Sequence, residues 1–313
     1  MDRKLAIFMP GRLASERLPN KLILPLGDSS LWEMACRKLN NLPEKYGKYV
    51  LIYDAELINI AKKYSNITII KRDVATTKID GPLTKIFTGV KDIDATHLMF
   101  LNPCLSFITE QTLIKSLEQF EHSIAEYATS VKLYQNWLFA SKPRKNLTEI
   151  DYKTLSTKDI PIYHEAAHVF HIFNKDRFFE DGMMLKDDHM LISVPKNETI
   201  DVDTQEDYEY ARFKHAKRYI FDIDGTICTI EYPNYIKAKP FVNRIEKVNY
   251  LYDAGNTIIF QTARGFGSGI DQKALTEKQL KQWEVKYHEL YFNKPHGDVY
   301  IDDKGVNDNQ FFN

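Results

Sequence analysis

The chain has few of the features that mark secreted, membrane or nucleic-acid-binding proteins. Its 313 residues include three cysteines, Cys36, Cys104 and Cys228, which are isolated and odd in number, so neither a disulfide framework nor a zinc motif is indicated. The 42 Lys and Arg residues nearly balance the 43 Asp and Glu residues, which removes the electrostatic argument for a nucleic-acid or membrane partner. The first apolar run, Leu5–Met9, is too short for a signal peptide, and no later run could span a bilayer. We therefore expect a cytoplasmic protein.

Two common nucleotide-binding patterns are also missing. Leu5–Met9 is predicted to be a buried strand, and the polar loop 10–21 follows it. That loop has neither the P-loop spacing nor the Gly-x-Gly-x-x-Gly dinucleotide pattern. A loop with glycine, serine and three cations directly after a first strand is still suited to holding phosphates, through backbone N–H groups and charge. The alternative is a solvated basic loop.

The order of the predicted elements favours an α/β fold with two domains. Strands are expected near 49–53, 67–70, 97–101, 129–133, 168–173 and 191–194, and helices near 31–42, 56–64, 84–90 and 109–120. This alternation predicts a mostly parallel sheet with helices on both faces. A chain of this length usually forms two cores, and we expect domains at 1–216 and 217–313.

The segment 135–167 interrupts this alternation without a clear period of its own. We expect it to leave the core and either cover the substrate or pack on a second subunit, which makes a homodimer the expected assembly. His168 and His171 follow it; they have no third ligand nearby in the sequence, so packing is favoured over metal binding.

Two pairs of alternate aspartates occupy positions where carboxylates can converge. Asp201 and Asp203 precede a helix that runs to about Lys214, and in an extended segment they share one face and can bind one cation, unless they only cap the helix. Asp222 and Asp224 end an apolar run that reads as a buried strand. Two carboxylates so close are costly unless a divalent cation or a phosphoryl transfer uses them. The alternative is a strand followed by a polar turn.

The N-terminal two thirds resemble a known family. The pattern Pro10-Gly11-Arg12-x2-Ser15-x-Arg17-Leu18-Pro19-x-Lys21 is similar to the opening motif of the cytidylyltransferases that make CMP-sialic acid and CMP-Kdo. The segment Ile200–Asp207 is similar to the Ile-Asp-x-Asp-Thr-x-Glu-Asp segment that closes their domain. The resemblance spans about residues 4 to 213 and implies a nucleotidyltransferase domain of the GT-A-like kind.

This resemblance assigns roles residue by residue. Arg12 and Lys21 would contact the triphosphate of CTP, and Asp201 and Asp203 would hold Mg²⁺ at the α-phosphate, where a substrate oxygen attacks. The segment 101–108 lacks the arginine that sialic-acid enzymes have there, which argues against sialic acid itself as the acceptor. Further residues implied to bind nucleotide or substrate are Ser15, Arg17, Arg72, Asp80 and Asn102, the last in place of a glutamine.

The last 95 or so residues resemble small phosphatases of the haloacid-dehalogenase superfamily, of the kind found with capsule and surface-polysaccharide genes. Four motifs follow in the expected order: Phe221–Thr226, Gln261–Gly265, Lys294-Pro295 and Tyr300–Lys304. The gaps between them leave no room for a cap domain, so the site should be open unless another domain, a partner subunit or a bulky substrate shields it.

The second resemblance also assigns roles. Asp222 would attack phosphorus and Asp224 would act as general acid and base. Thr262 would donate a hydrogen bond to the phosphoryl group, and Lys294, with Lys304 as the alternative, would neutralise its charge. Asp302 or Asp303 would bind Mg²⁺ together with Asp222 and Asp224, and Cys228 is expected to be a packed residue.

Together the two resemblances imply a bifunctional, Mg²⁺-dependent enzyme. One domain would transfer a cytidylyl group from CTP to a sugar acid or a related phosphorylated metabolite, and the other would hydrolyse a phosphate monoester, in the synthesis of a surface polysaccharide precursor. Two alternatives stay open. The phosphatase could be the sole activity beside a degenerate nucleotide-binding domain, or the chain could be a binding or scaffolding protein.

Overall fold

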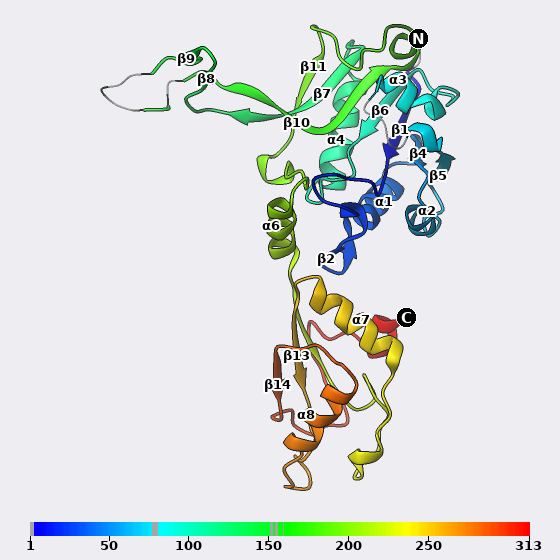
Figure 1. Cartoon of the computed structure of the whole chain (residues 1–313), viewed down its shortest axis with the longest axis vertical. Helices are drawn as coiled ribbons and strands as arrows, with labels where there is room; N and C mark the ends of the chain where they lie inside the picture. The colour runs from blue at the N-terminus through cyan, green and yellow to red at the C-terminus, as the bar shows by residue number, and fades with distance from the viewer. Residues whose placement is uncertain (1–2, 77–80, 151–152, 154–155, 159) are drawn as a thin grey trace. The chain divides into compact units, whose positions relative to one another are not determined.

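The computed structural model describes residues 3–76, 81–150, 153, 156–158 and 160–313 (Figure 1). The chain divides into two compact units, the first formed by Met1–Ile23 and Leu31–Tyr208 and the second by Leu24–Ser30 and Glu209–Asn313. Helix α6 (Gln205–His215) contains the point where the chain passes from the first unit to the second. In the part of the chain described, no helix has the length and apolar character needed to cross a membrane.

The first unit is built on a seven-stranded mixed sheet in the order β11-β7-β10-β6-β1-β4-β5. All of its strands run in one direction except β10, which pairs antiparallel with both β6 and β7. The strands are β1 (Leu5–Pro10), β4 (Gly47–Ile52), β5 (Thr68–Lys71), β6 (His97–Leu101), β7 (Tyr127–Tyr134), β10 (Tyr163–Asn174) and β11 (Met190–Ser193).

Helices connect the parallel strands as the sequence predicts. The helices of this unit are α1 (Leu31–Asn41), α2 (Ala55–Ala61), α3 (Leu83–Ile86), α4 (Glu110–Glu121) and α5 (Lys175–Asp181). The helix expected at 84–90 is shorter than predicted: α3 ends at Ile86, and a separate 3-10 turn, Thr88–Val90, follows. Gly89 lies in that turn with its Cα against Leu51 and Ile70, so the chain here packs closely on strands β4 and β5.

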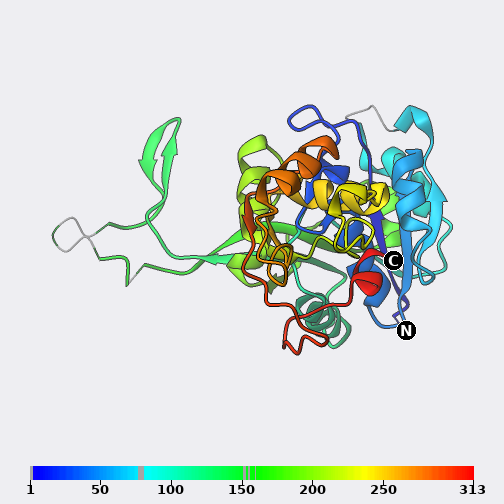
Figure 2. The same ribbon diagram turned by 90° about the horizontal axis from the view of Figure 1, so that it is seen from below.

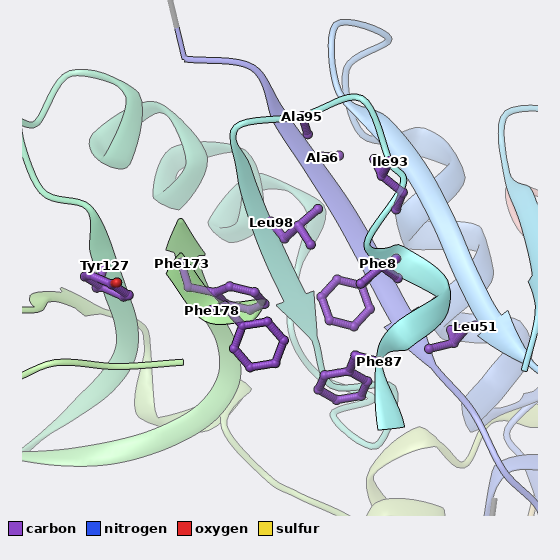
Figure 3. Packing of buried hydrophobic residues seen from close by; sticks show 11 residues of the cluster. Ala6, Phe8, Leu51, Phe87, Ile93, Ala95, Leu98, Tyr127, Phe173 and Phe178 are labelled. Carbon is purple, nitrogen blue, oxygen red and sulfur yellow. The ribbon is translucent and has the colours of Figure 1, made fainter. Parts of the chain in front are cut away.

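Aromatic side chains form the core on one side of this sheet (Figure 3). Phe8 on β1 packs edge-to-face on Phe87, with the ring centroids 5.1 Å apart. Phe173 on β10 packs on Phe178 of α5 at 4.7 Å. Because β10 carries the core side chain Phe173 into the cluster, its register is fixed by burial as well as by its backbone hydrogen bonds.

The segment 135–167 leaves the core, as expected. Strands β7 and β10 continue beyond the sheet as a two-stranded ribbon, from which a small hairpin of β8 (Phe139–Ser141) and β9 (Arg144–Asn146) branches. Figures 1 and 2 both show this arm extending away from the rest of its sheet.

The second unit is built on a three-stranded parallel sheet in the order β12-β13-β14, with strands β12 (Arg218–Phe221), β13 (Thr257–Gln261) and β14 (Glu289–Tyr291). Its hydrophobic core packs the sheet against helices α7 (Val242–Asp253) and α8 (Lys273–Gln282). The core includes Phe221, Ile245, Phe260 and Leu280. The short α9 (Asp308–Phe312) packs on the same core. A parallel sheet with crossover helices agrees with the α/β class predicted for this part of the chain, and its haloacid-dehalogenase-like identity stays a prediction.

The N-terminal insertion of the second unit is a hairpin of β2 (Pro25–Leu26) and β3 (Ser29–Ser30). The Asn256 side-chain amide donates to the Gly27 carbonyl at 2.6 Å, and the Tyr250 hydroxyl donates to the Ser29 carbonyl. The sequence gives no sign that this hairpin belongs with residues more than 200 positions later.

Candidate functional site

A cavity of about 840 Å³ lies in the first unit, lined by the basic loop and by the segments that follow its parallel strands. Arg12 follows β1, Arg72 follows β5 and Asn102 follows β6. Parallel strands bring their carboxyl ends to one edge of a sheet, which is where ligands bind in open α/β folds. The cavity therefore gathers residues that the sequence names separately; Ser15, Arg17 and Lys21 also line it.

Two cations of the basic loop bind one carboxylate. The Lys21 ammonium lies 2.6 Å from Asp203 Oδ1, and the Arg17 guanidinium lies 2.9 Å from Asp203 Oδ2. Burial by itself lowers the pKa of Lys21, but Cys104 and Asp203 outweigh it, so the pKa lies above its ordinary value. Lys21 is thus a fixed positive charge in the wall of the cavity. The loop is held on the rest of the site through Lys21 and Arg17, although most of its residues are exposed.

Asp201 lies beside this pair, in a drier place. Asn102 donates to Asp201 Oδ2 at 3.2 Å, whereas Oδ1 is buried and accepts no hydrogen bond from the described residues. Burial, reinforced by the charge of Asp203, raises the pKa of Asp201 above its ordinary value. An orphaned carboxylate oxygen beside a second carboxylate is what a divalent cation would satisfy, so the two aspartates fit the predicted Mg²⁺.

The metal prediction stays a prediction. Among the described residues, no group of three or more His, Cys, Asp or Glu side chains is arranged to hold a metal ion. A pair of carboxylates is nevertheless compatible with Mg²⁺, which commonly takes one or two carboxylates and completes its shell with water and substrate phosphate. Mg²⁺ bound there would supply positive charge next to a phosphoryl group.

A β-bulge that sequence reasoning missed supports Asp201. Strand β10 breaks register between Ala166 and His171, and His168 has a φ of 53°, which is uncommon for a residue with a side chain. The buried Ser130 hydroxyl accepts from the Val169 and Phe170 N–H groups, at 2.9 and 3.1 Å, and so pairs the donors that the bulge frees. No local pattern in the sequence predicts this bulge.

The bulge turns the His168 carbonyl toward Asn102. That carbonyl accepts from the Asn102 amide at 3.1 Å, and Asn102 Oδ1 accepts from the Cys104 N–H at 2.9 Å. Asn102 therefore positions Asp201 and the start of the next loop. His168 is exposed, but its ring packs edge-to-face on that of His171, with the centroids 6.1 Å apart. His171 is half-buried, and its Nδ1 lies 2.8 Å from the Thr129 hydroxyl.

Two further arginines, Arg12 and Arg72, add positive charge to the lining of the cavity. Arg72 is buried, and its guanidinium donates to the Thr76 hydroxyl at 3.1 Å and to the Thr76 carbonyl. Burial, followed by the nearby charge of Arg12, lowers the pKa of Arg72 from its ordinary value. Two like charges held close together favour an anion between them. Asp80, also predicted to bind nucleotide, lies outside the described residues.

A second candidate site lies at the carboxyl end of β12. The Lys294 ammonium lies 2.8 Å from Asp222 Oδ2 and 4.4 Å from the centroid of the Tyr300 ring. Asp222 Oδ1 accepts from the Ile223 N–H at 2.9 Å. Each oxygen of the Asp222 carboxylate therefore has a partner that fixes its position. Of the two lysines considered from the sequence, Lys294 is the one that contacts Asp222.

Asp224 is held by a residue to which sequence analysis gives no role. Arg264 donates from Nε to Asp224 Oδ2 at 2.8 Å and from Nη2 to Oδ1 at 2.7 Å. Its Nη1 donates to Gln279 and Thr276, and its guanidinium lies 4.9 Å from the Tyr235 ring centroid. Although burial lowers the pKa of Arg264, Asp224 outweighs burial and raises it. Arg264 stands inside the quoted motif, two residues after Thr262, and arginine is rarely buried unless it is paired.

Two other predicted residues lie near this pair. Thr262 is almost fully buried, and its hydroxyl accepts from the Arg264 N–H at 3.2 Å. The Cys228 thiol lies 3.6 Å from Asp224 Oδ1, and burial raises its pKa to about 12. The thiol is therefore protonated and packed, which agrees with the packing role expected of it.

Among the described residues, Asp302 and Asp303 do not form a group with Asp222 and Asp224 that could hold a metal ion. Asp302, Asp303 and Lys304 are exposed, in a segment without regular secondary structure. Asp302 Oδ1 accepts from the Lys304 N–H at 2.7 Å, a local turn contact. Their predicted roles in Mg²⁺ and phosphoryl binding stay predictions.

No protein-family model matches the chain, and no curated protein matches it either. Among solved structures, it is similar to a CMP:2-keto-3-deoxy-manno-octonic acid synthetase complexed with CTP, at 13% identity and a TM-score of 0.49 over 67% of this chain and 98% of the other. It is also similar to a 4-diphosphocytidyl-2C-methyl-D-erythritol synthase from Anaerococcus prevotii, at 12% identity and a TM-score of 0.46. This match covers 67% of this chain and 94% of the other. A structural-genomics target from Vibrio cholerae is 27% identical with a TM-score of 0.29, over 31% of this chain and 87% of the other. At TM-scores below 0.5 these similarities carry no conclusion about substrate.

Proposed function

We propose that the first unit is a cytidylyltransferase that uses CTP. The observation that carries this proposal is the pair of cations, Lys21 and Arg17, bound to Asp203 on the wall of a cavity that Arg12 and Arg72 also line. Four cations around a cavity large enough for a nucleotide suit a triphosphate, and the choice of cytidine rests on the sequence motifs at 10–21 and 200–207.

The proposed reaction needs no covalent intermediate with the protein. A substrate oxygen attacks the α-phosphorus, the bond to the bridging oxygen breaks, and pyrophosphate leaves, so the transition state needs fixed positive charge more than proton transfer. Lys21 and Arg12 would bind the departing phosphates. Asp201 and Asp203 fit a Mg²⁺ ion, and the acceptor, a sugar acid or related phosphorylated metabolite, would lie beside them.

Release of pyrophosphate from CTP tests the transferase. Full-length protein with Mg²⁺ is screened against sugar acids and phosphorylated metabolites, with Lys21→Met as the site variant and Lys115→Met, an exposed lysine on α4, as its matched control. We expect Lys21→Met to lower the rate roughly 100-fold and the control to leave it unchanged. Failure of the wild-type protein to bind CTP in calorimetry would contradict the proposal.

We propose that the second unit is a phosphomonoester phosphatase that works through an aspartyl-phosphate. Asp222 is oriented by Lys294 and by the Ile223 N–H, while Asp224 is held 2.7 to 2.8 Å from Arg264, so two neighbouring carboxylates have distinct environments. Distinct surroundings are what separate a nucleophile from a general acid. Asp222 would attack phosphorus as the bond to the ester oxygen breaks, and Asp224 would accept the proton of the water that hydrolyses the aspartyl-phosphate. To act as general acid in the first step, Asp224 would first have to take up a proton, which its pairing with Arg264 opposes.

Hydrolysis of p-nitrophenyl phosphate tests the phosphatase. Asp222→Asn removes the nucleophile and should lower the rate by at least roughly 10³-fold. Glu277→Gln, on the exposed face of α8, is the control that should not change it. Equal hydrolysis by wild type and Asp222→Asn would reject the aspartyl-phosphate route. If only this activity were found, the alternative of a degenerate nucleotide-binding first unit would stand.

We also propose that the arm formed by β7 to β10 joins two copies of the chain in a cytoplasmic homodimer. Large apolar side chains along it are exposed, with Phe139 at 60%, Leu147 at 50% and Ile162 at 55%. Large exposed apolar surface often marks a site of contact with another protein. Light scattering that finds only monomer at micromolar concentration would reject this assembly.

A further inference from the structure

A second cavity, of about 400 Å³, lies in the second unit and shares no lining residue with either candidate site. It is bordered by α6, the end of α7 and the segment before β14. Its lining includes Glu209, Arg212, Phe213, Tyr252, Gly255 and His288.

Arg212 is the unusual residue of this cavity. Its side chain lies across Gly255, so closely that a Cβ on that glycine would be 2.8 Å from Arg212 Cγ and Nε. Its Nε is buried and has no hydrogen-bond partner among the described residues. A buried guanidinium N–H without a partner costs free energy, which an anion bound in the cavity would recover.

The other side chains supply planar surfaces and a further donor. The rings of Tyr252 and His288 stack with centroids 4.6 Å apart, and Phe213 is 75% exposed beside Arg212. His288 Nδ1 accepts from the Ile258 N–H at 3.0 Å, so its proton is on Nε2, which can donate. Exposed aromatic rings next to a guanidinium suit a ligand with both a ring and a negative charge.

We propose that this cavity binds a small ligand that joins a planar ring to one anionic group, the class to which nucleoside monophosphates belong. Arg212 pairs with the phosphate, His288 donates to it, and the ring packs on Phe213. Glu209 lies three residues from Arg212 on α6, so a ligand that carries only negative charge also meets a carboxylate and is disfavoured. Because the cavity has no paired carboxylates and no nucleophile, the ligand is held there and not converted.

Calorimetry with CMP on the full chain tests this site. A Lys21→Met background removes one cation of the proposed nucleotide site of the first unit, and the CMP binding that then depends on Arg212 belongs to the second. In that background, Arg212→Met keeps the side-chain stem over Gly255 but removes the charge, and Phe213→Ala removes an exposed ring. Lys214→Met, an exposed cation on the same helix, is the matched control.

We expect CMP to bind the Lys21→Met protein, Arg212→Met to weaken that binding at least tenfold, and Lys214→Met to leave it unchanged. Inorganic phosphate should bind at least tenfold more weakly than CMP. The proposal is overturned if the Lys21→Met protein binds no CMP at millimolar concentration, if Arg212→Met has no effect, or if phosphate binds as tightly as CMP. If Arg212→Met removes all CMP binding, the cavity is supported, and the nucleotide site of the first unit is tested separately by its binding of CTP.

Discussion

Arg264 holds Asp224 through two parallel hydrogen bonds, of 2.8 Å from Nε and 2.7 Å from Nη2. The guanidinium side chain is fully buried, and its remaining donors are used by Thr276 and Gln279. A bidentate arginine fixes the plane of a carboxylate as well as its charge. In the proposed phosphatase, Arg264 is therefore a positioning residue for Asp224.

Replacing Arg264 tests this role. Arg264→Met leaves a partly buried carboxylate without its cation, and we expect it to lower the free energy of unfolding by about 3 kcal/mol. Arg264→Lys keeps the positive charge but loses the bidentate pair of hydrogen bonds to Asp224. We expect this variant to remain folded and to hydrolyse phosphate esters roughly 10- to 100-fold more slowly, with an altered pH profile. Urea unfolding and initial rates measure the two effects.

The control for that pair of variants is Arg218→Met, which removes an exposed arginine paired with Glu289 at 3.2 Å. An ion pair at the surface contributes little to the free energy of unfolding. Arg218→Met should therefore change neither the stability nor the rate of phosphate ester hydrolysis measurably. Full activity with an unchanged pH profile in Arg264→Lys would show that Arg264 only supports the fold.

Asp203→Asn should separate binding from turnover in the first unit. Asp203 now occupies both Lys21 and Arg17, so its loss frees two cations for a triphosphate while it removes one carboxylate from the proposed Mg²⁺ site. We expect CTP to bind equally well or more tightly without metal, and pyrophosphate release to fall roughly 100-fold. Calorimetry with EDTA and a coupled pyrophosphate assay measure the two. Glu206→Gln, exposed at the start of α6, is the control, and a parallel loss of binding and turnover would contradict this split.

Gly11 lies against two buried side chains that leave no room for a methyl group. A Cβ at Gly11 would lie 2.9 Å from Trp32 Cζ3 and 3.1 Å from Ile52 Cγ2, and both neighbours are fully buried. We expect Gly11→Ala to lower the free energy of unfolding by about 1–3 kcal/mol. Adding Trp32→Phe, which gives the methyl group room, should make the double variant more stable than the sum of the single changes predicts.

Gly267→Ala is the matched control for Gly11, because nothing lies within 4 Å of the Cβ that it would add. Urea midpoints of the variants measure the coupling between positions 11 and 32. Strict additivity would mean that Trp32 is not what excludes alanine.

His171 should make the first unit lose stability in acid. Burial, with smaller effects of His168 and His189, lowers the pKa of His171 to about 4, below the value of about 6.5 expected in an unfolded chain. Between these values the unfolded chain binds a proton that the folded chain does not, so the free energy of unfolding rises with pH and is lost as pH falls from about 6.5 to 4.

His171→Gln removes this titration. We expect its urea midpoint to differ less between pH 7.5 and pH 5 than the wild-type midpoint does. His164→Gln, exposed on the same strand, should retain the wild-type difference. An unchanged difference in His171→Gln would assign the acid sensitivity to other groups.

Local patterns in the sequence determine most of the elements of this protein. Strand β6 and helix α1 follow the predicted ranges within a residue or two, because buried strands and amphipathic helices are recorded in the spacing of apolar residues. The basic loop and the two aspartate pairs are also visible, since each is a short run of residues with a recognisable composition.

Tertiary structure alone decides what these residues contact. The antiparallel course of β10, the bulge at His168 and the docking of residues 24–30 on the second unit depend on pairing between positions far apart in the sequence. The same holds for the choice of Arg264 as the partner of Asp224, 40 residues away. Periodicity records which side of an element is buried, but not which residue lies opposite, and that contact sets the charge and orientation of each carboxylate.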